Sequence, residues 1–216
     1  LTYQQPSEEI MKLVDYDRPP WALIDTDAKN MVLLYRDTYK SIADLSEEEM
    51  RLGGLRINPK TNIGSRTTFY DKVAIQKIGS KTANPVTGLP GKAKLANLNW
   101  SQDESMIAMT NTNETGTAVW VLDIDKGAAR QVTGYSVNAN MGNPIDWFED
   151  GNALLIKMLD DDRKPLIDTS TAIPEGPTIS TSDGSKAQNR TYQDLLKNPA
   201  DEYNFEQLAQ SKLVKV

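Results

Sequence analysis

The segment Gly134-Tyr135-Ser136-Val137-Asn138 is the nearest approach in this sequence to the turn that presents a nucleophilic serine. That turn reads Gly-x-Ser-x-Gly, and Asn138 stands where the second glycine belongs. The 216 residues contain no histidine and no cysteine, so Ser136 lacks its usual general base and thiol chemistry is excluded. We therefore interpret the segment as a turn between strands and predict no catalytic residue in this chain.

Three other segments have residue types that could bind an ion or a phosphate. Residues 88–93 carry two glycines and a lysine, but the glycine spacing of a phosphate-binding loop is wrong and no Ser or Thr follows Lys92. Residues 160–162 and 123–127 offer carboxylates to calcium, yet neither continues to the distal glutamate of a calcium loop. Solvated turns are the better interpretation, and we predict no metal and no cofactor.

The overall charge and the hydrophobic pattern exclude two broad classes of protein. With 24 Lys and Arg against 30 Asp and Glu, the net charge is −6, which argues against a protein that binds nucleic acid through clustered positive charge. No apolar run approaches the roughly 18 residues that a membrane-spanning helix needs. The first residues also lack the basic start and apolar stretch of a signal peptide.

An internal repeat is the clearest sign of how the chain is organised. Residues 98–109 read as strand, polar turn and strand, residues 145–156 repeat this pattern, and residues 24–33 form a weaker copy. In the first two copies a tryptophan precedes the turn, and in all three an aspartate lies four residues ahead of an apolar strand position. These aspartates are Asp27, Asp103 and Asp150.

The repeat belongs to a longer unit of four short strands, which ends near residue 134. A unit of this size matches the roughly 40–50 residues of a propeller blade, whereas a β-sandwich does not demand a recurring Trp–turn–strand cassette. We predict an all-β fold, a partial β-propeller of about two to three four-stranded antiparallel blades. The expected blades cover about 10–75, 76–134 and, incompletely, 135–216.

Short helical insertions interrupt the strands. Residues 43–51 are expected to form a helix with Ser46 as N-cap and Glu49 completing a capping box. Helical spacing also occurs in residues 192–196 and 203–209, and residues 212–216 look like the beginning of a strand.

Several segments together resemble the glutamyl endopeptidases of the prolyl oligopeptidase family. The resemblance extends over most of the chain, and residues 190–197 are its most specific part, because a generic propeller has no reason to carry them. The segments are 43–45, 49–57, 62–70, 119–123, 164–166 and 190–197.

The resemblance implies an architecture and a function. Members of the family have an N-terminal propeller of seven or eight blades and a C-terminal α/β-hydrolase domain with a Ser–Asp–His triad. This chain is similar to the first blades only, so the expected function is to gate and help bind peptide substrates for a catalytic domain that lies elsewhere. The alternative is a non-catalytic periplasmic binding protein of the TolB type.

Two arginines in the resembling segments are the predicted substrate-binding residues, Arg56 and Arg66. A peptidase that selects acidic side chains needs a positive partner, and arginine can donate two parallel hydrogen bonds to a carboxylate. Both flank residues 58–62, a loop expected to project toward a neighbouring domain. The alternative is that either arginine simply pairs with the glutamates at 47–49.

The remaining expectations concern partners and location. The predicted partners are a peptide substrate and, through the open edges of an incomplete ring, a second copy of the chain. As part of a serine peptidase of this kind, the chain is expected to be periplasmic or secreted.

Overall fold

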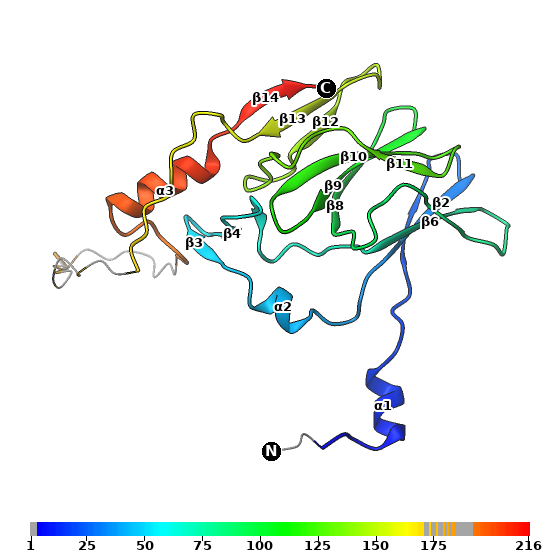
Figure 1. Ribbon diagram of the computed structural model, residues 1–216, viewed down its shortest axis with the longest axis horizontal. Coiled ribbons are helices and arrows are strands. Elements are labelled where there is room, and N and C mark those ends of the chain that lie inside the picture. The colour runs from blue at the N-terminus through cyan, green and yellow to red at the C-terminus, as the bar shows by residue number, and fades with distance from the viewer. Residues whose placement is uncertain are drawn as a thin grey trace.

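Three antiparallel sheets follow one another along the chain and lie face to face (Figure 1). This computed structural model describes residues 4–170 and 192–216, together with residues 173, 176, 179, 181, 183 and 184. Stacked antiparallel sheets of consecutive strands are the blades of a β-propeller. The predicted partial propeller with short helical insertions is therefore confirmed.

The first sheet has the order β1-β2-β6-β7. Its strands are β1 (Trp21–Ile24), β2 (Asn30–Tyr35), β6 (Lys72–Lys77) and β7 (Asn84–Pro85). Between β2 and β6 the chain leaves this sheet and forms an insertion. The insertion contains α2 (Ile42–Leu45) and a small sheet of β3 (Met50–Leu52), β4 (Leu55–Asn58) and β5 (Ile63–Gly64).

The second and third sheets continue the same antiparallel pattern. The second sheet consists of β8 (Leu95–Trp100), β9 (Met106–Thr112), β10 (Thr117–Asp123) and β11 (Ala128–Gln131) in consecutive order. The third consists of β12 (Ile145–Trp147), β13 (Leu154–Met158) and β14 (Lys212–Lys215), with α3 (Pro199–Ala209) between β13 and β14. The predicted blade limits near residues 75 and 134 stay a prediction, and β6 runs across the first of them.

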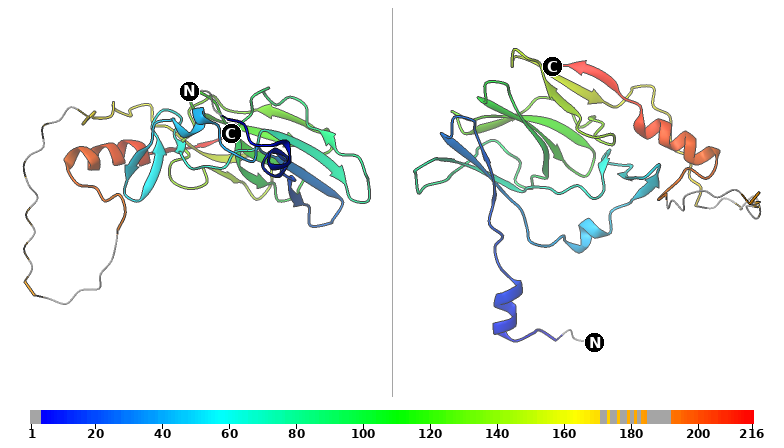
Figure 2. Two further views of the ribbon diagram at one scale, coloured as in Figure 1. Left: turned by 90° about the horizontal axis from the view of Figure 1, so that it is seen from below. Right: turned by 180° about the vertical axis from the view of Figure 1, so that it is seen from behind.

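Helix α1 (Glu8–Val14) lies apart from the sheets, at the end of an extended arm (Figures 1 and 2). None of its residues is buried. In the described part of the chain, no helix has both the length and the apolar character that crossing a membrane requires.

Three hairpins have the same register, and they are the three copies of the predicted repeat. One pair of residues closes each turn: Ile24 with Met31, Trp100 with Ile107, and Trp147 with Leu154. Two of the three predicted aspartates shape their turns, because Asp103 and Asp150 each accept a hydrogen bond from the backbone N–H two residues later. The repeat in the sequence is thus a repeat of hairpin geometry.

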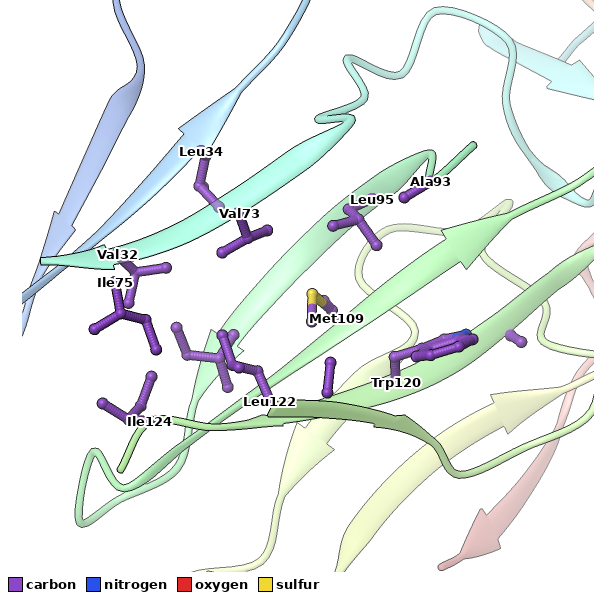
Figure 3. Close-up of a cluster of buried hydrophobic side chains, with 13 residues drawn as sticks. Val32, Leu34, Val73, Ile75, Ala93, Leu95, Met109, Trp120, Leu122 and Ile124 are labelled. Carbon is purple, nitrogen blue, oxygen red and sulfur yellow. The ribbon is translucent and has the colours of Figure 1, made fainter. Parts of the chain in front are cut away.

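Strand β9 explains why the sheets stack. Its side chains alternate between the two faces, so that Ile107 and Met109 pack against the first sheet while Ala108 packs against the third. Figure 3 shows Val32, Leu34, Val73 and Ile75 of the first sheet directed at the side chains of the second. Both faces of the central sheet are therefore buried.

The predicted helix at 43–51 forms earlier and is shorter. Ser41 is the N-cap of α2: its hydroxyl accepts from the backbone N–H of Asp44, whose carboxylate accepts from the backbone N–H of Ser41. Ser46 is the C-cap, so its predicted capping box with Glu49 is wrong. Asp44 occupies the third helical position, where the sequence pattern suggested a glutamate, and Glu49 instead precedes β3.

The C-terminal predictions are partly confirmed. Residues 203–209 lie in α3, which begins earlier because Asn198 caps it and Pro199 occupies its first position. Residues 192–196 do not form the predicted helix, and Asp194 has a left-handed φ of 53°. The strand predicted at 212–216 is β14, which pairs with β13.

Candidate functional site

The candidate site is a group of charged and polar side chains on the insertion and on the segment before α3, gathered around the Glu49–Arg56 ion pair. We refer to it as the Glu49 cluster; its members are Glu49, Arg51, Arg56, Ser65, Arg66 and Asp194. All of them belong to segments that resemble the glutamyl endopeptidases.

The β3–β4 hairpin positions the arginines of the cluster. Its turn is Gly53-Gly54, with φ angles of 58° and 81°, which suits a two-residue turn with two left-handed positions. This turn places Arg51 directly opposite Arg56. Glu49 immediately precedes β3 and lies within reach of both guanidinium groups.

Arg56 is engaged by two carboxylates. Its Nη1 donates to Glu49 Oε1 at 2.9 Å, and its Nε lies 3.0 Å from Asp194 Oδ2. The Arg56 side chain is only 19% exposed. Two carboxylates therefore already occupy the guanidinium donors of Arg56, at Nη1 and Nε.

Glu49 is held as an anion by four partners. The Ser65 hydroxyl donates to Oε2 at 2.6 Å, and Arg51 Nε donates to Oε1 at 2.9 Å. The hydrogen bonds from Ser65 and Arg56 lower the pKa of Glu49 to about 2. Such a carboxylate is a weak base, so the Ser65–Glu49 contact orients the serine without activating it as a nucleophile.

Arg66 differs from Arg56 in being largely free. Its side chain is 68% exposed, and its Nε lies 3.7 Å from Glu49 Oε2. The structure therefore brings both predicted arginines to the same glutamate, as the ion-pairing alternative expected. Of the two predicted arginines, only Arg66 has a largely exposed side chain.

The loop at 58–62 does not project, contrary to expectation. Asn58, Thr61 and Asn62 are buried. Asn58 Oδ1 accepts from the backbone of Lys60 and Thr61, and the carbonyl of Asn62 accepts from the backbone N–H of Ala139. Buried polar groups must find hydrogen-bond partners, and here those partners draw the loop into the molecule.

A cleft of about 390 Å³ lies beside the cluster. Lys94 closes one wall, where it pairs with Asp44 at 2.8 Å and Glu47 at 3.0 Å. The lining holds equal numbers of basic and acidic side chains: Arg36, Lys40, Lys92 and Lys94, and Asp37, Asp44, Glu47 and Asp71. This balanced, polar lining suits a peptide backbone better than a strongly charged ligand.

The other motifs take the structural roles that the sequence analysis preferred. The carbonyl of Ser136 accepts from Leu159 N–H, and Asn138 is buried against the end of α3, so this segment is a connection between strands. Asp123 pairs with Lys126 in a turn. Across residues 4–170 and 192–216 and the six single described residues, no group of three His, Cys, Asp or Glu could hold a metal ion.

The sheets and this cluster define a partial β-propeller with a charged insertion, and comparison with known proteins indicates which proteins it resembles. The chain is 31% identical over 230 residues to "Probable glutamyl endopeptidase, chloroplastic" of Arabidopsis thaliana, covering 98% of this chain and 23% of that protein. The protein of that name from Oryza sativa subsp. japonica is 29% identical over 227 residues, with coverages of 98% and 24%. The predicted resemblance to glutamyl endopeptidases is confirmed, and the chain spans about a quarter of the length of these relatives.

Two solved structures overlap with parts of the chain. TolB from Acinetobacter baumannii is 18% identical and covers 49% of this chain and 24% of its own, with a TM-score of 0.32. A dipeptidyl aminopeptidase IV-like protein from Bacteroides ovatus is 11% identical and covers 64% and 20%, with a TM-score of 0.37. Because both TM-scores are low, we base the fold on the sheets of this structure and not on these overlaps. No protein-family model matches the chain.

Sequence reasoning identified the two arginines but missed the residues that hold Arg56 and Glu49. Asp194 and Ser65 are those partners, and both stand in segments quoted for the resemblance. The available signal was that both residues lie in segments that resemble the same family as the segment containing Glu49 and Arg56. Arg190 and Thr191, which begin the most specific segment, lie outside the described residues.

Proposed function

We propose that this chain forms part of the propeller of a serine peptidase that cleaves peptides after acidic residues, where it gates and helps to bind the substrate. The carrying observation is the similarity to glutamyl endopeptidases over 98% of the chain. The 216 residues hold no histidine, so the triad of such an enzyme would come from a domain outside them.

The test compares the complete coding sequence with the chain alone. We expect a Gly-x-Ser-x-Gly turn within an α/β pattern, and cleavage of Glu–x peptides that is lost when its serine becomes alanine. The 216-residue chain should leave the same peptides intact. Turnover that follows the purified chain and disappears on mutation of one of its own residues would contradict the proposal.

The alternative is a non-catalytic periplasmic binding protein of the TolB type. The absence of His and Cys and the balanced lining of the cleft suit this function equally. A reading frame that ends without an α/β-hydrolase pattern would favour it. The resemblance to peptidases over nearly the whole chain makes it the second choice.

Within the peptidase, we propose that Arg66 is the arginine that contacts an acidic substrate group and that Arg56 supports it by fixing Glu49. The different exposure of the two side chains supports these different roles, because Arg66 is open to solvent and Arg56 is held by two carboxylates. Arg66→Gln in the complete enzyme should lower kcat/KM for glutamyl peptides by roughly one to two orders of magnitude. The matched control is Arg130→Gln on the exposed side of β11; equal kinetics for both variants would exclude a substrate role for Arg66.

We further propose a periplasmic or secreted location and self-association of the isolated chain. The curated relatives are named chloroplastic, so they leave this location open. Supporting self-association, Leu213 of β14 is 64% exposed and Phe148 and Val216 are also exposed. Cell fractionation tests the location, and light scattering that finds a compact monomer would contradict self-association.

A further inference from the structure

Arg163 is a partly buried arginine without an acidic partner. It lies in the loop that follows β13, and its Nη1 donates to Asn62 Oδ1 at 2.5 Å. It forms no ion pair with any residue in the described part of the chain. Among the described residues, the hydrogen-bond partner of its guanidinium is therefore a neutral amide.

This state is energetically unfavourable for a guanidinium. Arginine has five N–H donors and a permanent charge, and burial without a counter-charge costs free energy. Burial lowers the pKa of Arg163, which is the direction expected for a cation that loses water without gaining an anion. Arg56, the other partly buried arginine described above, holds two carboxylates.

None of the carboxylates of the turn at 160–162 forms an ion pair with Arg163. Asp160 Oδ1 accepts from the backbone N–H of Asp162, and Asp161 pairs with Lys212. The backbone N–H of Arg163 donates to the carbonyl of Asp160, which closes the turn. The turn therefore carries carboxylates without supplying one to Arg163.

The surface under Arg163 is rigid and neutral. Asn62 is buried, has a left-handed φ of 57°, and is fixed by hydrogen bonds from its Nδ2 to Lys60 and from Ala139 N–H to its carbonyl. Asn138 and Asn140, on the neighbouring segment, both donate to the carbonyl of Leu208. Because the Asn62 amide holds Nη1 of Arg163 in place, the other N–H groups of the guanidinium have a defined orientation for binding a ligand.

We propose that Arg163 is a binding residue for a carboxylate group of a peptide, either an acidic side chain or a C-terminal carboxylate. A single planar guanidinium matches a single planar carboxylate in charge and in hydrogen-bond geometry. A phosphate would need more positive charge than this one arginine supplies, because Lys212 is already paired. The peptide as the source of the carboxylate rests on the proposed function. The unpaired guanidinium is an observation that does not depend on that function.

The test uses three blocked peptides and the side-chain Nε–Hε signal of Arg163 in the 216-residue chain. The first peptide is acetyl-Ala-Glu-Ala-amide, the second is acetyl-Ala-Gln-Ala with a free C-terminal carboxylate, and the third is acetyl-Ala-Gln-Ala-amide. We expect the Arg163 signal to shift with the first or the second at concentrations at least tenfold below those that the third requires. The peptide that shifts it identifies the source of the carboxylate.

Variants check that the preference arises at this residue. Arg163→Gln should abolish the preference for a charged peptide, Arg163→Lys should retain part of it, and Arg130→Gln, on the exposed side of β11, should retain all of it. An Arg163 signal that responds equally to charged and neutral peptides would overturn the proposal, even if the variants fail to fold. A preference that survives Arg163→Gln would overturn it as well.

Failure of this proposal can be distinguished from failure of the peptidase proposal. Cleavage of Glu–x peptides by the complete protein can persist when Arg163 binds no carboxylate, and that result would remove this inference alone. Carboxylate binding by a protein that proves to have no peptidase activity would leave Arg163 as the ligand-binding residue of the alternative binding protein.

Discussion

Arg56 and Asp194 are far apart in the sequence, yet Nε of Arg56 lies 3.0 Å from Oδ2 of Asp194. The same contact region includes a hydrogen bond from Gly54 N–H to the carbonyl of Asp194, and Phe205 of α3 packs against Gly53. These contacts join the insertion of the first sheet to the segment before α3 in the third. The junction between the insertion and the C-terminal segment therefore depends on charge as well as on the apolar contacts of Leu52, Ile57 and Leu208.

Replacing Arg56 by glutamine should destabilise the fold by about 1–3 kcal/mol, because two partly buried carboxylates lose their common cation. The control is Arg51→Gln, whose side chain is 59% exposed and should contribute less than about 1 kcal/mol. Urea unfolding of the two variants measures the difference. Equal free energies of unfolding would mean that the Arg56 ion pairs stabilise the structure no more than the exposed ion pair of Arg51 does.

Glu49 should make the free energy of unfolding depend on pH. Its pKa falls from the ordinary 4.5 to about 2 in the folded chain, so its stabilisation is complete above about pH 4.5 and is lost as the pH falls toward 2. Glu49→Gln should therefore lose less stability than the parent between pH 5 and pH 3. Unfolding midpoints at several pH values test this, with Glu114→Gln in an exposed turn as the control; parallel curves for parent and Glu49→Gln would contradict it.

Gly88 should not tolerate alanine. Its φ is 82°, and an added Cβ would lie 2.2 Å from the carbonyl oxygen of Ala129 in β11, so the contact between the first and second sheets would open. The left-handed backbone and the clash together should cost at least about 2 kcal/mol. Gly91→Ala is the control, since nothing lies within 4 Å of its Cβ position. Similar thermal midpoints for the two variants would argue against this packing.

Met109 should be the most costly methionine to truncate among those of the sheets. It is fully buried between the first and second sheets, and Met109→Ala should lower the free energy of unfolding by about 2–5 kcal/mol. Met141→Ala, at a position 38% exposed, should have a small effect. A cost below about 1 kcal/mol for Met109→Ala would indicate that the two sheets do not pack face to face in solution.

The amino-acid sequence alone determined the blades. The repeat around Trp100 and Trp147 predicted a strand, a turn and a second strand in each copy, and both copies are hairpins whose turns are closed by equivalent residue pairs. The strand and turn signals are both local, because a strand alternates with period two and a turn depends on the residues within it. Local patterns also compete, and the capping box formed at Ser41 and Asp44 instead of at Ser46 and Glu49.

Only the tertiary structure decided which charges meet. The chain has 30 acidic residues, and no local pattern indicates that Arg56 pairs with Glu49 and Asp194 or that Arg66 stays exposed. Nor does any local pattern indicate that Arg163 has no acidic partner among the described residues. Residues 58–62 look like a surface loop by composition, yet their amide groups find buried partners. The physical reason is that strand and turn preferences act between near neighbours, whereas an ion pair forms wherever packing of distant elements brings opposite charges within a few ångströms.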